Sequence, residues 1–235
     1  MCTEPTGVVD GTSGDHEAHV TTLVRGAPCA RWHTAAVTVP PIRTLTPSDL
    51  DAAQRVLGRA FADDPIMEFV FRGRPNAAAG IGRLFRLFAG EHVRHDGCSI
   101  TTDETAIALW APPGEWKLAW SRQLRMAPSL LRLFGLGSFG HLAGYTRMEQ
   151  QHDAMPPEHW YLSVIGTDPD HQGKGAGSAL ITPVIERCDE QGLGAYLESS
   201  KAENVPYYRR FGFEVVEEHA FRGGPSYWRM WRDPR

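Results

Sequence analysis

The segment that most limits the possible folds of this chain is Gln172-Gly173-Lys174-Gly175-Ala176-Gly177. It follows residues 160–167, which alternate as a strand does, and it leads into 175–191, where apolar residues recur with helical spacing. Glycines let the backbone approach a ligand closely, and the free N–H groups at the start of a helix attract anions. The segment therefore predicts a strand–turn–helix unit that holds a phosphate group. A plain connecting loop has a similar composition, and the spacing is neither that of a Walker loop nor that of the dinucleotide fingerprint.

The rest of the pattern predicts one α+β domain over residues 39–235, in which strands and helices are mixed along the chain. Further strands are expected at 42–45, 98–102, 106–111, 195–199, 213–218 and 227–231. Helices are expected from Ser48 or Asp49 to 61, at 77–93 and at 204–210, and a helical stretch at about 115–153. Pro183 predicts a kink in the helix after the glycine-rich turn. Residues 1–38 show no periodicity, and we expect them to be a flexible leader.

Charge and cysteine content exclude several classes of function. The net charge of -4 over 235 residues gives no basis for binding nucleic acid or an anionic membrane. Cys2, Cys29, Cys98 and Cys188 have the spacing of neither a metal site nor a disulfide framework, which favours a reducing, cytoplasmic location. The His92/His95 pair and a similar pair in the leader lack further ligands, so we expect no metal.

Three elements in order carry a family resemblance. A strand ends in Val164-Ile165-Gly166-Thr167-Asp168-Pro169, the glycine-rich turn and a helix follow, and Asn204, Tyr208 and Gly212-Phe213 come later. Over about residues 158–220 this arrangement resembles the GNAT superfamily of acyl-CoA-dependent N-acyltransferases. The stretches from Asp168, at Leu197-Glu198 and at Pro206-Tyr207-Tyr208 are similar to the branch that contains puromycin N-acetyltransferase. The resemblance implies a central, mixed and mostly antiparallel sheet flanked by helices, with a helical insertion at about 115–153.

The same resemblance implies acetyl-CoA as co-substrate and assigns residues to it. Backbone groups of Ile165, Gly166 and Thr167 would pair with the pantetheine arm. The pyrophosphate would be held by N–H groups of the turn, at Gln172, Gly173, Lys174, Gly175, Ala176, Gly177 and Ser178. Asn204 would hydrogen-bond the cofactor, although a helix N-cap is the other interpretation of this residue. Lys174 is equally well explained as a solvated surface lysine.

Two residues are candidates for proton transfer. Tyr208 corresponds to the family's general acid, because a phenol can donate a proton to the departing thiolate. Its other interpretation is a core aromatic, a role that suits its neighbour Tyr207 better. The attacking amine must lose a proton, and Glu198, on the strand beside the expected cofactor slot, is the first candidate for the base. Other carboxylates in the acceptor half are Asp63, Asp64, Glu68 and Glu149, and a chain of water molecules is a further option.

The sequence thus predicts an N-acetyltransferase in which a small-molecule amine attacks acetyl-CoA directly. Antibiotic-like amines are among the acceptors expected, and the enzyme is expected to be a monomer or a homodimer. Trp116 and Trp120 would form an apolar wall for the acceptor, or belong to the ordinary core. The alternatives are a protein or peptide amine acetyltransferase and a non-catalytic acyl-CoA-binding module.

Overall fold

The computed structural model describes residues 39–117, 120–135 and 151–235, and all of these lie in one compact unit, Val37–Arg235. The predicted leader, Glu149 and most of the second half of the predicted helical insertion lie outside the described residues. No helix in the described part of the chain combines the length and the apolar character needed to cross a membrane.

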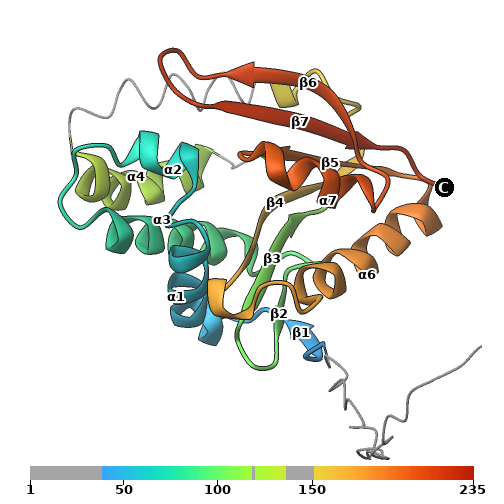
Figure 1. Ribbon diagram of the computed structural model, residues 1–235, viewed down its shortest axis with the longest axis horizontal. Coiled ribbons are helices and arrows are strands. Elements are labelled where there is room, and N and C mark those ends of the chain that lie inside the picture. The colour runs from blue at the N-terminus through green and yellow to red at the C-terminus, as the bar shows by residue number, and fades with distance from the viewer. Residues whose placement is uncertain (1–38, 118–119, 136–150) are drawn as a thin grey trace, which may run out of the picture. The chain divides into compact units, whose positions relative to one another are not determined.

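A seven-stranded sheet forms the centre of this unit, in the order β1-β2-β3-β4-β5-β7-β6 (Figure 1). Its strands are β1 (Ile42–Thr44), β2 (Ser99–Thr101), β3 (Ala106–Ala111), β4 (His159–Thr167), β5 (Gly194–Ser199), β6 (Glu214–Ala220) and β7 (Ser226–Arg232). The β4–β5 pair is parallel, and the other neighbouring pairs are antiparallel. The predicted mixed, mostly antiparallel sheet is therefore confirmed, and the strand ends differ from the predicted ones by one or two residues.

The helices connect these strands and cover the sheet. They are α1 (Leu50–Ala60), α2 (Pro65–Val70), α3 (Ala77–His92), α4 (Trp120–Phe134), α6 (Ala176–Gln191) and α7 (Val205–Arg209), with short 3-10 turns η1 (Pro47–Asp49), η3 (Pro169–His171) and η4 (Ala202–Asn204). Helix α2 was not predicted, because six residues are too few to show a periodic apolar stripe. Its start is fixed by Asp64, whose carboxylate accepts hydrogen bonds from the backbone N–H groups of Ile66 and Met67, both at 3.0 Å.

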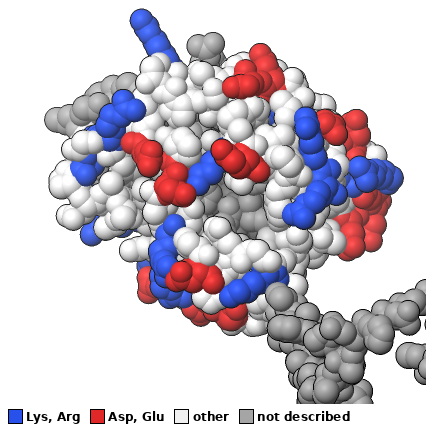
Figure 2. Space-filling model, viewed as in Figure 1, with Lys and Arg blue, Asp and Glu red and all other residues white. Residues whose placement is uncertain are grey.

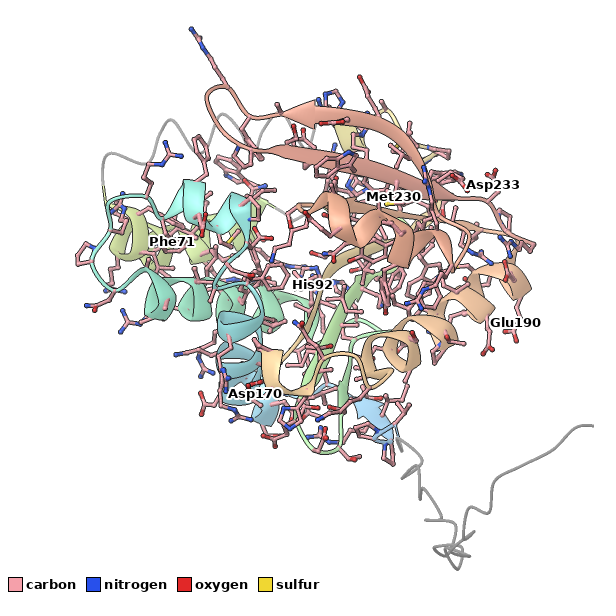
Figure 3. All side chains as sticks on the ribbon, viewed as in Figure 1. Phe71, His92, Asp170, Glu190, Met230 and Asp233 are labelled. Atoms are coloured by element: carbon pink, nitrogen blue, oxygen red, sulfur yellow. The ribbon has the colours of Figure 1, made fainter. Side chains whose placement is uncertain are left out.

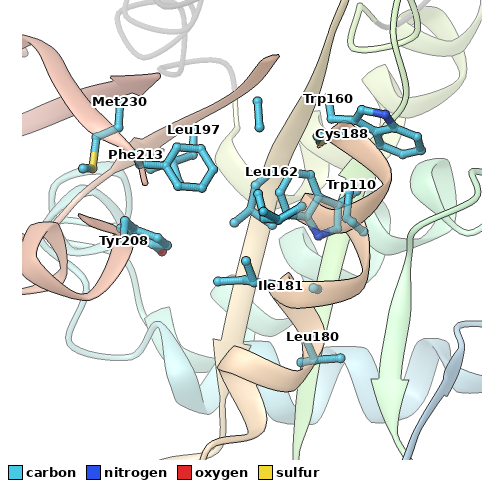
Figure 4. Packing of buried hydrophobic residues seen from close by; sticks show 14 of the residues in the cluster. Trp110, Trp160, Leu162, Leu180, Ile181, Cys188, Leu197, Tyr208, Phe213 and Met230 are labelled. Atoms are coloured by element: carbon cyan, nitrogen blue, oxygen red, sulfur yellow. The ribbon is translucent and has the colours of Figure 1, made fainter. Parts of the chain in front are cut away.

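The two faces of the sheet bury separate hydrophobic clusters. Along β3, Ala106, Ala108 and Trp110 face the cluster under α6 and α7, whereas Ile107 and Leu109 face the cluster under α1 and α3. This alternation is the period of two that a strand imposes on its side chains. Figure 4 shows the first cluster, with helix α6 lying over Trp110 and Leu162. Because both faces are covered, a residue of β4 or β5 is exposed only where the packing is interrupted.

Helix α4 corrects one expectation about the insertion. Trp120 is 72% exposed, so it is not a core residue, whereas Met126 on the same helix is buried. A separation of six positions leaves the two residues about 240° apart around the helix axis, which places the two side chains on different sides. Trp116 takes another position: its ring stacks on His152, with 3.7 Å between the ring centroids.

An ion pair between β7 and α6, in which the arginine is buried, makes a testable contribution to the stability of the fold. The guanidinium group of Arg232 on β7 donates to both carboxylate oxygens of Asp189 on α6, at 2.8 and 2.7 Å, and to the carbonyl oxygen of Phe211 at 2.8 Å. We expect Arg232→Ala to lower the free energy of unfolding by about 2 kcal/mol or more, since it leaves these acceptors without their charged donor. Urea denaturation followed by circular dichroism measures the loss.

The matched control is Arg209→Ala. Arg209 pairs with Glu214 at 3.6 Å, and both side chains are more than half exposed. Such surface pairs contribute little, so a change below about 0.5 kcal/mol is expected. Equal losses in the two variants would contradict the importance assigned to the Arg232–Asp189 pair.

Candidate functional site

The sheet divides where β4 and β5 cease to pair. Their parallel ladder runs from His159 opposite Gly194 to Leu162 opposite Leu197, and then stops. Both strands continue, β4 through residues 163–167 beside β3, and β5 through Glu198 and Ser199 beside β7. Backbone groups of 163–167 on the side of β5 therefore have no strand partner. We call this opening, between 163–167 of β4 and Glu198–Ser199 of β5, the β4–β5 split.

A β-bulge in β4 lies at the point where the split begins. Leu109 of β3 is opposite Val164, but the next residue, Trp110, is opposite Leu162, so Ser163 is the extra residue. The bulge reverses the side-chain alternation, because Leu162 belongs to the α6 cluster and Val164 to the α1 cluster. Gly166 then faces α1, where an added Cβ would lie 2.8 Å from Cδ2 of Leu57. Close packing of α1 is thus sufficient to explain a glycine at this position.

The turn after β4 is held by carboxylates and an arginine from α1. Asp168 is buried and accepts a hydrogen bond from the N–H of Asp170 at 3.1 Å. Arg59 bridges the two carboxylates, at 3.3 Å from Asp168 and 2.8 Å from Asp170. Figure 3 labels Asp170, which lies beside α1. The side-chain amide of Gln172 donates to the carbonyl oxygen of Thr167 at 3.2 Å. These bonds fix the direction in which the chain enters α6.

The start of α6 presents free backbone N–H groups beside the split. Gly173 and Gly175 have φ values of +76° and +86°, which other residues adopt only with strain. Ala176, Gly177 and Ser178 form the first turn, whose N–H groups have no acceptor within the helix. An added Cβ at Gly177 would lie 2.6 Å from the hydroxyl oxygen of Tyr207, so this glycine allows α7 to approach. Lys174 is exposed, and its ammonium group donates to the carbonyl oxygen of Asp170 at 3.3 Å.

Helix α7 brings Tyr208 to the other side of the split. Tyr208 is only 8% exposed, and Figure 4 shows its hydroxyl group pointing from α7 toward β4. Burial, followed by smaller contributions from Tyr207 and Asp64, raises the pKa of Tyr208 above its ordinary value, so the phenol keeps its proton at neutral pH. Asn204 occupies the N-cap position of α7 but makes no capping hydrogen bond, and its side chain is exposed. The interpretation of Asn204 as a helix cap is therefore wrong for its side chain.

The connection between α1 and α2 is tied to the end of β5. Asp63 pairs with Lys201 at 2.8 Å, and the carboxylate of Asp64 accepts a hydrogen bond from the hydroxyl group of Ser200. Asp64 is also the cap of α2, so its two oxygens are already occupied. Of the carboxylates considered as bases besides Glu198, Asp63 and Asp64 thus have structural partners, and Glu68 is exposed on α2.

Glu198 lies at the edge of the split, on the sheet face opposite to Leu197. It is half-buried, and hydroxyl groups of Tyr196 and Tyr161 hydrogen-bond its carboxylate. Burial raises the pKa of Glu198 to about 7, while the two tyrosines and Arg229 act in the opposite direction to a smaller extent. A carboxylate with a pKa near 7 is suited to take a proton at neutral pH.

The predicted residues therefore come together around one opening. Strand residues 165–167, the turn 172–178, Glu198 and Tyr208 border the split from four elements, whereas Asn204 lies exposed at the start of α7. Sequence reasoning missed Arg59, Tyr161, Tyr196 and Arg229, because their contacts join distant segments and no local motif marks them. Within the described residues, no cluster of side chains suitable for a metal ion is present.

The surface around this site carries no large area of one charge. Figure 2 shows Lys and Arg side chains mixed with Asp and Glu over the viewed face, which is hollowed near its centre between the regions of α1 and α7. A surface of this kind gives little long-range attraction to a polyanion.

Comparison with known proteins gives consistent results. The sequence profile of the Acetyltransferase (GNAT) family matches residues 91–213. An uncharacterized N-acetyltransferase of Schizosaccharomyces pombe is 29% identical over 175 residues, which cover 70% of each chain. Among solved structures, a Corynebacterium glutamicum protein described as histone acetyltransferase HPA2 and related acetyltransferase superposes with a TM-score of 0.62 at 23% identity, over 84% of this chain and 98% of the other. The Drosophila melanogaster polyamine N-acetyltransferase gives 0.59 at 15% identity, over 82% and 99%. Both of these structures share the fold of this chain.

Proposed function

Because the chain belongs to the Acetyltransferase (GNAT) family and is an N-acetyltransferase, we propose that it transfers the acetyl group of acetyl-CoA to the primary amine of a small molecule. The observation that supports this proposal most is the β4–β5 split. It places a free strand edge, a helix N-terminus, a buried phenol and a carboxylate with a pKa near 7 around one opening.

The residues around the split are chemically suited to acetyl-CoA, the co-substrate of this family. The strand edge at Ile165, Gly166 and Thr167 has no partner in β5 and would offer backbone hydrogen bonds to the amide groups of the pantetheine arm, although the carbonyl oxygen of Thr167 already accepts from Gln172. The N–H groups of 173–178, at the positive end of the α6 dipole, would hold the pyrophosphate. Lys174 adds a positive charge beside them, and the exposed amide of Asn204 would hydrogen-bond the cofactor.

The catalytic roles follow from the protonation states. Acetyl-CoA supplies the thioester that the amine attacks. Glu198 accepts a proton from the incoming ammonium group, for which its pKa of about 7 is well placed. A backbone N–H at 165–167 stabilises the negative charge that develops on the acetyl oxygen. Tyr208, whose phenol is protonated at neutral pH, donates its proton to the sulfur atom as the C–S bond breaks. The second proton that the attacking nitrogen loses as the amide forms returns to the Tyr208 phenolate and restores the phenol.

Direct attack by the amine is favoured over a covalent acyl-enzyme. The described cysteines, Cys98 and Cys188, are buried, and burial raises the pKa of each thiol to about 12. A thiol with this pKa is almost never a thiolate at neutral pH and is therefore a poor nucleophile.

The contacts beside the β4–β5 split favour a small acceptor. The Asp63–Lys201 pair and the Asp64–Ser200 hydrogen bond join the α1–α2 connection to the residues that directly follow β5. A peptide substrate would need an open groove on both sides of its amine, and a tie between two segments this close in sequence to Glu198 disfavours such a groove.

Release of the CoA thiol from acetyl-CoA, measured with a thiol reagent across a panel of amines, tests this proposal. The panel contains puromycin, aminoglycosides, polyamines, aromatic amines, amino acids and short peptides, and mass spectrometry identifies the product. Turnover with one class of small amine is expected. Turnover with peptides alone would identify a protein or peptide acetyltransferase, and acetyl-CoA binding without any turnover would identify a binding module.

A further inference from the structure

Arg229 of β7 faces Glu198 of β5 but does not pair with it directly. The two residues are opposite each other in the antiparallel register, and Arg229 is only 5% exposed. Opposite charges at such positions commonly form an ion pair. Here each of the three guanidinium nitrogens donates to another group: Nε to the hydroxyl oxygen of Tyr196 at 3.1 Å, Nη1 to Glu217 at 3.1 Å, and Nη2 to the carbonyl oxygen of Gln151 at 2.7 Å. Among the described residues, Arg229 forms its ion pair with Glu217 and not with Glu198.

The bond from Arg229 determines what the Tyr196 hydroxyl group can do. A phenolic hydroxyl has one proton to donate, and its oxygen accepts. Since the Tyr196 oxygen accepts from Arg229, its own proton remains for Glu198, which Tyr196 hydrogen-bonds. Tyr161 on β4 provides a second hydroxyl group to the same carboxylate. Glu198 is thus held by two neutral donors, one of which is oriented by a buried cation.

The aromatic packing restricts this arrangement further. The His152 ring contacts the rings of Tyr161 and Tyr196, at centroid distances of 4.5 and 4.6 Å, and the Trp116 ring stacks on it. His159 bonds to His152 with 2.8 Å between their Nε2 atoms. Burial lowers the pKa of His152 to about 3 and also lowers the pKa of His159, so both rings are uncharged at neutral pH. They support the tyrosines without adding charge near Glu198.

We propose that Tyr196, held by Arg229, is a positioning residue that orients the Glu198 carboxylate toward the split and stabilises its charged form. This inference rests on the proposed role of Glu198 as the base. The groups that face Glu198 are Tyr196 on its own strand, Tyr161 on β4 and Arg229 on β7, with Glu217 on β6 behind Arg229. Burial alone would keep Glu198 protonated, and the hydrogen bonds from the tyrosines and the charge of Arg229 counteract it.

Titration of the Glu198 side chain by NMR tests this proposal without reference to activity. The protein carries carbon-13 at the glutamate carboxyl groups, and Glu198→Gln assigns the signal. We expect a midpoint near 7 in the unaltered protein. Tyr196→Phe keeps the ring but removes the donor, and it should raise the midpoint by about one pH unit, since a hydrogen bond to a charged group contributes roughly this much. The acid limb of kcat/KM should move in the same direction.

A second variant covers the case in which Tyr196→Phe does not fold. Arg229→Lys keeps the positive charge but removes the planar donor that orients Tyr196, and it should also raise the midpoint. A midpoint that stays unchanged or falls in a folded variant overturns the proposal. If the midpoint of Glu198 rises but the pH profile of kcat/KM does not change, Tyr196 acts on Glu198 as proposed and Glu198 is not the base. Failure of the Tyr196 proposal and failure of the Glu198 assignment therefore give different results.

Discussion

Tyr208→Phe is expected to lower kcat about 10²-fold or more, because it removes the proton donor for the departing thiolate. The phenylalanine ring fills the same space in the cluster beneath α7, where Tyr208 is buried, so little change in stability is expected. The KM for acetyl-CoA should stay within about threefold, since the cofactor is held by backbone groups of β4 and of the turn before α6. Steady-state kinetics with the best amine of the panel provide the measurement.

The neighbouring tyrosine provides the matched control for this substitution. Tyr207 is on the same helix, but its hydroxyl oxygen lies against Gly177 of α6. Tyr207→Phe should therefore retain at least about half of kcat. If the two variants lost activity to the same extent, or if Tyr208→Phe were fully active, the assignment of Tyr208 as the acid would be incorrect.

Glu198→Gln is expected to lower kcat/KM about 10²-fold at pH 7.5 and to change the shape of the pH profile. A base acts only when it is deprotonated, so the unaltered enzyme should lose activity as the pH falls through about 7, the pKa of Glu198. In the variant this limb should disappear. Activity should then rise steadily toward high pH, as the free amine, with a pKa near 10, becomes more abundant.

Glu203→Gln is the control for Glu198→Gln, because Glu203 is an exposed glutamate in η4, the turn between β5 and α7. The pH profile of kcat/KM of Glu203→Gln should match that of the unaltered enzyme. If Glu198→Gln still lost activity as the pH falls through about 7, the base would be another group or a water molecule.

The parts of the site that the sequence predicts are those with a local chemical signature. The turn 172–178 combines left-handed glycines with a helix start, and Tyr208 has a fixed spacing to Gly212-Phe213. Both features are contained in short segments, so the chain itself specifies them. The order of strands and helices was predictable for the same reason, apart from α2, which is too short to show a period.

The remaining features depend on how distant segments meet. The bulge at Ser163 was not predictable, because Leu162 and Val164 are both apolar and suit either face of the sheet. Trp120 had two interpretations, a core residue or part of an acceptor wall, and its exposure excludes the first of them. The sequence did not decide this, since an apolar residue on a helix does not show which side packs. The Arg229–Tyr196 contact requires the register of β5 and β7, which no motif indicates.

A crystal structure with acetyl-CoA will show directly whether the β4–β5 split is the cofactor site. We predict that the pantetheine arm lies between residues 163–167 of β4 and Glu198–Ser199 of β5. The pyrophosphate should lie on the N–H groups of 173–178, with the sulfur atom within hydrogen-bond reach of Tyr208. Acetyl-CoA bound elsewhere, for example in the polar groove lined by Arg94, Arg187 and Trp160 at the opposite ends of β4 and α6, would contradict it.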